Sequence, residues 1–181
     1  MREKVVKRAP SLSPSPRRSS SLPPLIGHGA RGASLDVAKL LRILPHRPPM
    51  LLLDRVIDIE PRKTARGIKA VSANEPAVRG HFPTQPVFPP TLCLESMAQL
   101  MCVLIYASDA LDPSCQQFAL AGCEKVKFRQ SVVPGDRMDI FVRVINHRSN
   151  IWKCSAVVSV DDVLCVEAEL LAAIQDVEDY E

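Results

Sequence analysis

The sequence predicts an α+β fold in which an antiparallel β-sheet wraps around one long central α-helix, at about residues 90–108. The first observation is the segment 91–108, which is apolar almost all round and therefore typical of a helix buried inside a domain. The second is the order of the extended segments, with two before this helix and four after it, separated by turn signals. A sheet wrapped around a single apolar helix is the simplest arrangement that buries such a helix.

The region before the central helix predicts a short helix, two strands and a loop. Residues 35–44 place apolar side chains at helical spacing and stop at Pro45, which indicates the short helix. Residues 49–60 and 63–73 have the pattern of extended segments. A loop then runs from Asn74 to Pro89, carries four prolines and contains His81, so it leads directly into the central helix.

Four strands are predicted after the central helix, at 117–129, 136–148, 150–160 and 163–174. Turn signals separate them at Pro134-Gly135-Asp136, between Asn146 and Asn150, and at Asp161-Asp162. In the second of these strands, Met138, Ile140 and Val142 occupy every other position. This alternation is typical of an antiparallel strand with one buried face.

The positive charge of the chain lies in its first segment. Residues 1–31 carry a net charge of +6, and the remaining 150 carry −3, which argues against a nucleic-acid-binding domain. The Ser/Pro-rich composition of 9–24 predicts a disordered basic extension over 1–34, followed by one domain over 35–176 and a tail over 177–181. Organellar targeting by this Arg- and Ser-rich extension is the alternative. No apolar run reaches the roughly 20 residues of a membrane span.

The cysteine pattern favours packing over metal binding. The six cysteines are Cys93, Cys102, Cys115, Cys123, Cys154 and Cys165. No two of them form the C-x-x-C pair that structural metal sites commonly use, so we expect no metal site. Several lie inside apolar runs, and we expect all of them to be reduced and packed as small hydrophobic side chains. Reduced cysteines favour a cytoplasmic location.

Two residues near the start of the central helix are candidates for acid–base chemistry. Glu95 is a carboxylate on an otherwise apolar helix, and Gln99 lies on the same helical face, where it can orient the carboxylate. Burial would favour the protonated form, which is the form a proton donor needs. A purely structural carboxylate is the alternative. His81, in the preceding loop, is either a catalytic base or an ordinary solvated histidine.

Three blocks of sequence carry a resemblance to a known family. The run from Gly80 to Gln99, GHFPTQPVFPPTLCLESMAQ, resembles the signature G-H-F-P-G-x-P-x-M-P-G-x-L-x-x-E-A-M-A-Q of the FabZ-type 3-hydroxyacyl-acyl-carrier-protein dehydratases. Upstream, LPHRPPMLLLDRV (44–56) resembles that family's L-P-H-R-x-P-F-L-L-V-D-R-V, and downstream KFRQSVVPGD (127–136) resembles R-F-R-x-P-V-V-P-G-D. The similarity covers about residues 36–174 and implies a hot-dog fold.

The resemblance also implies an activity and a set of site residues. In such a dehydratase His81 is the base that removes the C2 proton of a (3R)-3-hydroxyacyl thioester, Glu95 protonates the departing C3 hydroxyl, and Gln99 orients Glu95. The product is a trans-2-enoyl chain of fatty-acid or related lipid or polyene biosynthesis. The implied acyl-tunnel residues are Phe82, Val87, Phe88, Leu92 and Phe118. The implied contacts for acyl carrier protein are Lys125, Lys127 and Arg129, with ordinary solvated strand residues as the alternative.

The implied assembly is a homodimer or trimer of dimers, with His81 and Glu95 of each site on opposite subunits. A heterodimer with a paralogous dehydratase is the alternative. The substrate arrives on the 4'-phosphopantetheine arm of acyl carrier protein, and no other cofactor is implied.

The loop departs from the family pattern at Thr84, Phe88 and Pro90, which replace glycine, methionine and glycine. Family members polarise the thioester carbonyl with the backbone N–H of the second glycine, and proline has no N–H. Proline suits the first turn of a helix, so the fold should tolerate the change. Two interpretations follow. Either a neighbouring N–H such as that of Thr91 takes this role, or the protein is a weakened or inactive carrier-binding subunit that pairs with an active paralogue.

Overall fold

The computed structural model describes residues 34–109, 111 and 116–176. The predicted extension and tail therefore fall almost entirely outside the described residues. The elements are α1 (Val37–Ile43), β1 (Arg55–Glu60), β2 (Thr64–Ala70), α2 (Pro76–Gly80), α3 (Pro90–Asp109), β3 (Gln116–Phe128), β4 (Arg137–Arg148), β5 (Ile151–Val160) and β6 (Val163–Asp176).

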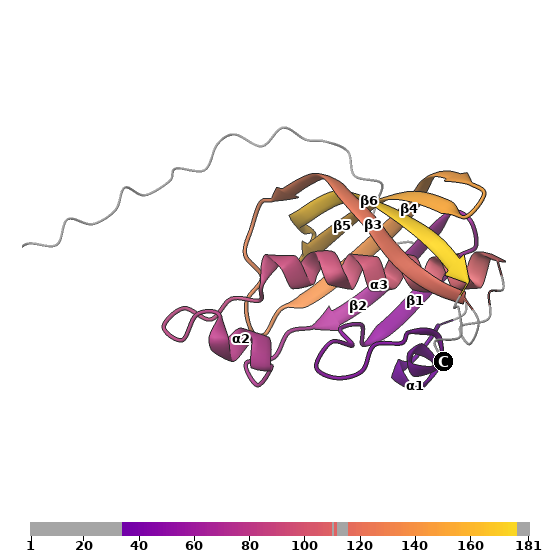
Figure 1. Cartoon of the computed structure of the whole chain (residues 1–181). Helices are drawn as coiled ribbons and strands as arrows, with labels where there is room; N and C mark the ends of the chain where they lie inside the picture. The colour runs from indigo at the N-terminus through magenta and orange to yellow at the C-terminus, as the bar shows by residue number, and fades with distance from the viewer. Residues whose placement is uncertain (1–33, 110, 112–115, 177–181) are drawn as a thin grey trace, which may run out of the picture.

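All six of these strands belong to one antiparallel sheet, in the order β1-β2-β4-β5-β6-β3. Figure 1 shows the sheet curving around α3, and α3 packs against every strand. This arrangement is the hot-dog fold, which confirms the predicted fold class. The strand β3 lies at one edge of the sheet, next to β6.

Helix α3 is the centre of the hydrophobic core. Its side chains from Ser96 to Tyr106 are all buried, including the polar Ser96 and Gln99. By length and composition α3 is apolar enough to cross a membrane, but 67% of that window is buried inside the protein. Close packing also limits its neighbours, because a Cβ added to Gly67 of β2 would lie 3.2 Å from Cδ1 of Leu100.

The strand β3 is longer than the stretch of β6 with which it pairs. Its register shifts between Leu120 and Gly122 and again between Glu124 and Lys127. At each shift β3 advances one residue more than β6, which is the pattern of a β-bulge. Bulges bend a strand and increase its local twist.

Two predictions for the region before α3 were wrong in detail. The extended segment predicted at 49–60 becomes a strand only at Arg55, because Gln99 of α3 takes up the backbone groups of Met50 and Leu52 that a strand would pair. The predicted loop 74–89 contains the short helix α2, which has proline at its first position. The other predicted helices and strands lie within a few residues of the observed ones.

The described cysteines follow the predicted packing with one exception. Cys93, Cys102, Cys154 and Cys165 are buried, whereas Cys123 on β3 is exposed, so for Cys123 the prediction was wrong. Burial raises the pKa of the Cys93 and Cys154 thiols to about 12. These core thiols therefore remain protonated at neutral pH.

Candidate active site

Gln99 holds Glu95 in one orientation. The Gln99 side-chain oxygen accepts a hydrogen bond from the Leu52 N–H (3.0 Å), and its nitrogen donates to the Met50 carbonyl (2.7 Å). These two backbone groups fix which end of the amide is oxygen and which is nitrogen. The second hydrogen of the same nitrogen then points to Oε1 of Glu95, at 2.8 Å. Oε1 therefore accepts this hydrogen bond, whereas Oε2 has no hydrogen-bond partner among the described residues.

His46 also contacts this carboxylate, although the sequence analysis assigned it no role. Its Nε2 lies 3.2 Å from Oε1 of Glu95, while its Nδ1 is buried without a hydrogen-bond partner among the described residues. Arg47 stabilises the loop by donating to the carbonyls of Leu44 and His46, both at 2.8 Å. His46 belongs to the block LPHRPPMLLLDRV at residues 44–56, and its place in that block is the signal that could have pointed to it.

Glu95 lies at the wall of an open cavity of about 180 Å³. The cavity is lined by Pro45, His46, Glu95, Ala98, Gln99, Gln117, Phe118 and Leu120. The carboxylate is about one-quarter exposed, so the cavity gives a ligand access to it. Of the five side chains assigned to the acyl tunnel, this cavity includes Phe118.

His81 is held by the loop that precedes α3. Its backbone N–H donates to the Val78 carbonyl of α2, and its own carbonyl accepts from the Val87 N–H (2.9 Å). The ring Nδ1 lies 3.3 Å from the Val87 carbonyl oxygen, and the ring stacks on Phe82. A carbonyl can only accept, so this contact requires the proton on Nδ1 and leaves Nε2 as the basic nitrogen.

The structure does not bring His81 and Glu95 together within one chain. Of the described residues, Gln99 and His46 are the hydrogen-bond and ion-pair partners of Glu95, and His81 is absent from the lining of its cavity. The other four tunnel residues, Phe82, Val87, Phe88 and Leu92, do not line this cavity.

The start of α3 carries one available backbone donor. Pro90 has no N–H, and the N–H groups of Leu92 and Cys93 both donate to the Pro89 carbonyl, at 2.9 and 3.3 Å. The N–H of Thr91 has no partner among the described residues. It therefore lies free at the positive end of the helix dipole, where a partial negative charge is stabilised.

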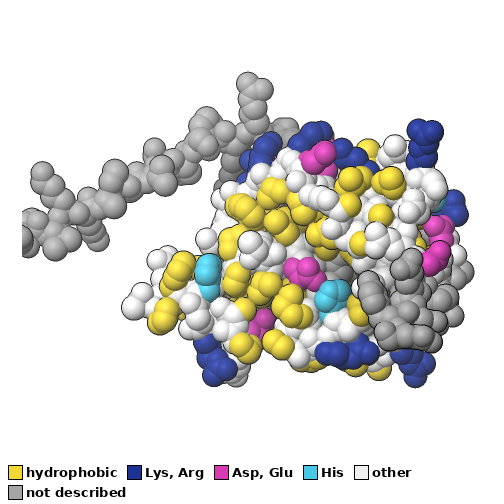
Figure 2. Space-filling model, in the orientation of Figure 1, with side chains coloured by type: hydrophobic (Ala, Val, Ile, Leu, Met, Phe, Trp, Pro, Cys, Tyr) yellow, Lys and Arg dark blue, Asp and Glu magenta, His cyan; other side chains and the backbone are white. Residues whose placement is uncertain are grey.

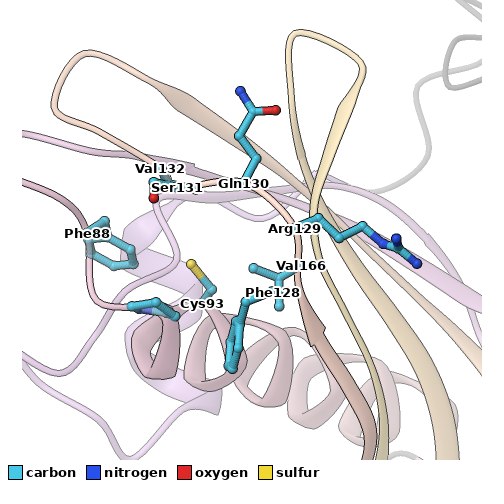
Figure 3. Close-up of a pocket in the computed structure, with 9 residues that line it drawn as sticks. Phe88, Cys93, Phe128, Arg129, Gln130, Ser131, Val132 and Val166 are labelled. Carbon is cyan, nitrogen blue, oxygen red and sulfur yellow. The ribbon is translucent and has the colours of Figure 1, made fainter. Parts of the chain in front are cut away.

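A second cavity, of about 150 Å³, lies at this end of α3 (Figure 3). Its lining is Phe88, Pro90, Cys93, Phe128, Arg129, Gln130, Ser131, Val132 and Val166. Figure 3 shows the Arg129 side chain extending away from the cavity, so the lining around Phe88, Cys93 and Phe128 is mainly apolar.

Hydrophobic side chains gather around acidic and histidine side chains on one face of the molecule (Figure 2). The exposed large hydrophobic residues include Phe82, Leu120 and Phe128, at 57%, 42% and 52% exposure. Leu120 and Phe128 lie on β3, the edge strand, and each lines one of the two cavities.

The three basic residues assigned to the carrier protein are ion-paired with β6. Lys125 pairs with Glu169 (2.6 Å), while Lys127 and Arg129 both pair with Glu167 (3.3 and 2.7 Å). The hydrogen bond from Arg129, with a further one from Lys127, lowers the pKa of the Glu167 carboxyl. These cations are therefore partly neutralised on the sheet surface.

Comparison with known proteins identifies the family to which this chain belongs. The FabA-like domain matches residues 44–169, which include both Glu95 and His81. The FabZ 3-hydroxyacyl-[acyl-carrier-protein] dehydratase of Sorangium cellulosum is 48% identical over 143 residues, which are 79% of this chain and 92% of that protein. The FabZ enzyme of Myxococcus xanthus is 40% identical, over 78% of this chain and 93% of that protein. The chain belongs to the FabZ-type dehydratase family.

A solved structure supports the fold. The dehydratase heterocomplex ApeI:P from Xenorhabdus doucetiae matches with a TM-score of 0.61 and 19% identity, over 78% of this chain and 93% of that chain. At this identity the likeness shows a shared hot-dog fold.

Proposed function

We propose that this protein removes water from (3R)-3-hydroxyacyl chains attached to acyl carrier protein, giving trans-2-enoyl chains for fatty-acid or related lipid biosynthesis. The observation that carries the proposal is the carboxylate of Glu95, fixed by Gln99 at the wall of an open cavity on an otherwise apolar helix. The FabZ relatives act on the same kind of substrate, as their names state.

The chemistry needs one base and one acid. Nε2 of His81 takes the proton from C2 of the thioester, and the electron pair of that bond forms the C2–C3 double bond. The C3–O bond breaks as Oε2 of Glu95 gives its proton to the leaving hydroxyl, which departs as water. Proton exchange between imidazolium and carboxylate then restores both groups. Positioned proton transfer of this kind contributes about 10²–10⁴ in rate.

Thr91 replaces the donor that Pro90 removes. The negative charge that develops on the thioester carbonyl needs an N–H at the start of α3. The Thr91 N–H is the one in the first turn that is free among the described residues. This favours an active enzyme over the alternative of an inactive carrier-binding subunit.

Each site is formed by two chains, with His81 from one and Glu95 from the other. This arrangement accounts for the lack of contact between the two residues in one chain. It also accounts for the exposed hydrophobic residues of the edge strand β3. A homodimer, alone or in a trimer of dimers, is the assembly we propose, and a heterodimer with a paralogous dehydratase is the alternative.

Turnover of 3-hydroxyacyl carrier protein to the trans-2-enoyl product tests the proposal. We expect His81→Ala and Glu95→Gln each to lose about 10²–10⁴ in kcat. Mixing the two inactive variants at equal amounts should restore about one-quarter of the wild-type sites. Half of the dimers are then mixed, and each mixed dimer has one intact site. No recovery in dimers that exchange subunits would contradict the shared site, and no turnover by folded wild type would contradict the activity.

The proposed partner is an acidic acyl carrier protein, contacted by Lys125, Lys127 and Arg129. With Lys153, these residues make four positive charges. They are ion-paired with three glutamates, Glu124, Glu167 and Glu169, so the group has a net charge of +1. We propose no cofactor beyond the phosphopantetheine arm of the carrier. The free thiols of the described cysteines favour a cytoplasmic location.

A further inference from the structure

We propose that Lys69 is a positioning residue for His81, because its ammonium group holds both ends of the segment 75–88 that contains the histidine. This inference rests on the proposed function for the role of His81. It goes beyond that function because Lys69 touches neither His81 nor Glu95. Lys69 lies on β2 and is almost fully buried, at 7% exposure.

At the first end of the segment, Lys69 binds Glu75. Its Nζ donates to Oε1 of Glu75 and to the Ala70 carbonyl, both at 2.7 Å. The same carboxylate oxygen accepts the N–H of Ser72 at 3.0 Å. Glu75 immediately precedes α2, so this pair fixes the point where the chain enters the helix that leads to His81.

At the second end, the ammonium faces the ring of Phe88. Nζ lies 5.9 Å from the ring centroid, within the range of a cation–π interaction. Phe88 is 1% exposed, and its N–H donates to the Val132 carbonyl at 2.8 Å, just before α3 begins. Phe88 is also a position where this chain departs from the family's methionine, and a methionine offers no aromatic ring to the cation.

The segment between these ends is held by hydrogen bonds among its own backbone groups and by the buried side chain of Val78. Helix α2 has only five residues and no side-chain hydrogen bond at its start, and a helix this short is unstable without tertiary contacts. Residues 82–86 are exposed. The orientation of His81 therefore also depends on how the two ends are anchored, and one buried cation joins them.

Dehydratase kinetics of Lys69→Met and of Lys69→Met/Glu75→Gln test the proposal. The single variant leaves an unpaired, partly buried carboxylate and is expected to lower Tm. The double variant removes both charges and should recover Tm. We expect both variants to lower kcat about 10- to 100-fold, because small misplacement of a catalytic group has effects of this size. KM for the acylated carrier should change less than about threefold.

Two further variants sharpen the comparison. Lys63→Met, at an exposed lysine paired with Glu60, is the matched control and should keep wild-type kinetics. Phe88→Met keeps the apolar volume and should lower kcat about two- to fivefold. Wild-type kcat in Lys69→Met, or recovery of kcat together with Tm in the double variant, would overturn the proposal.

An activity-independent readout separates this proposal from the proposed function. The N–H groups of His81 and Val87 are hydrogen-bonded inside the segment, so hydrogen exchange reports its order directly. In the double variant we expect faster exchange at these two amides and unchanged exchange in the middle of α3. Unchanged exchange at His81 and Val87 would overturn the proposal even if the wild type proves to have no dehydratase activity.

Discussion

Replacing Pro90 by glycine adds a backbone N–H at the start of α3 and restores the residue of the family signature. We expect this change to alter kcat/KM by less than about threefold, because the Thr91 N–H already supplies the carbonyl donor. The structure provides the basis for this expectation. In the first turn, the amides of Leu92 and Cys93 are both occupied by the Pro89 carbonyl, and the Thr91 amide has no partner among the described residues.

The magnitudes of the two possible outcomes are well separated. If no donor served the carbonyl in the natural protein, adding one would raise the rate by about 10²–10³, or about 3–4 kcal/mol of transition-state stabilisation. The stability of the protein should fall in Pro90→Gly. Glycine gives the unfolded chain more conformational entropy than proline does, which lowers the free energy of unfolding by about 1 kcal/mol. For a chain of this size that lowers Tm by about 2–4 °C.

The assay is the rate of trans-2-enoyl product from 3-hydroxyacyl carrier protein for wild type and Pro90→Gly, with Tm measured on the same samples. Pro86→Gly is a matched control in the same loop but outside the helix. A gain of 100-fold or more in Pro90→Gly alone would refute the role of Thr91 and would mark the natural protein as an impaired relative.

Three further changes have outcomes set by single contacts. His46→Phe removes the nitrogen that lies 3.2 Å from Oε1 of Glu95. We expect about a tenfold loss of kcat, while His46→Gln, which keeps a donor, should retain most of it; equal losses would argue against this role. Gly67→Ala places a Cβ 3.2 Å from Leu100, and we expect urea unfolding to show a loss of about 1–3 kcal/mol; an unchanged midpoint would mean that Leu100 moves aside freely. Glu167→Gln removes a carboxylate whose pKa is lowered from 4.5. Its stabilisation is present above that value and is lost as the pH falls through the lowered pKa. The free energy of unfolding of Glu167→Gln should therefore be lower than that of wild type by at most about 1 kcal/mol. This difference should be constant from about pH 5 to 7 and shrink below about pH 4. A difference that persists in acid would exclude the ion pairs as its source.

The fold could be predicted because its main signals are local. The apolar segment 91–108 and the alternation of Met138, Ile140 and Val142 each depend on a few neighbouring residues, and the structure places them as expected. The apolar run at residues 50–53 misled the prediction because a side chain 47 residues away, Gln99, binds its backbone. No local pattern reports such a contact.

The site was less predictable because several of its contacts join residues that are far apart in the sequence. The sequence pointed to Glu95 and its partner Gln99, because a carboxylate with an amide four residues later on one helix is itself a local pattern. His46 and Lys69 act through residues on other elements, so their surroundings become visible only in the folded chain. The pairing of His81 with Glu95 depends on a second chain and stays a prediction.

The two bulges of β3 have a geometric consequence for the two cavities. Residues 116–128 of β3 pair with residues 166–176 of β6, so 13 residues span the same length of ladder as 11. The two additional residues add about 7 Å of contour length to the edge strand. Phe118 and Phe128, near the two ends of this arc, each line one of the cavities along α3. Phe118 and Phe128 pair with Ile174 and Val166 of β6, so the ladder sets the spacing between the two cavities, and a residue lost from either bulge would shorten β3 without changing that spacing.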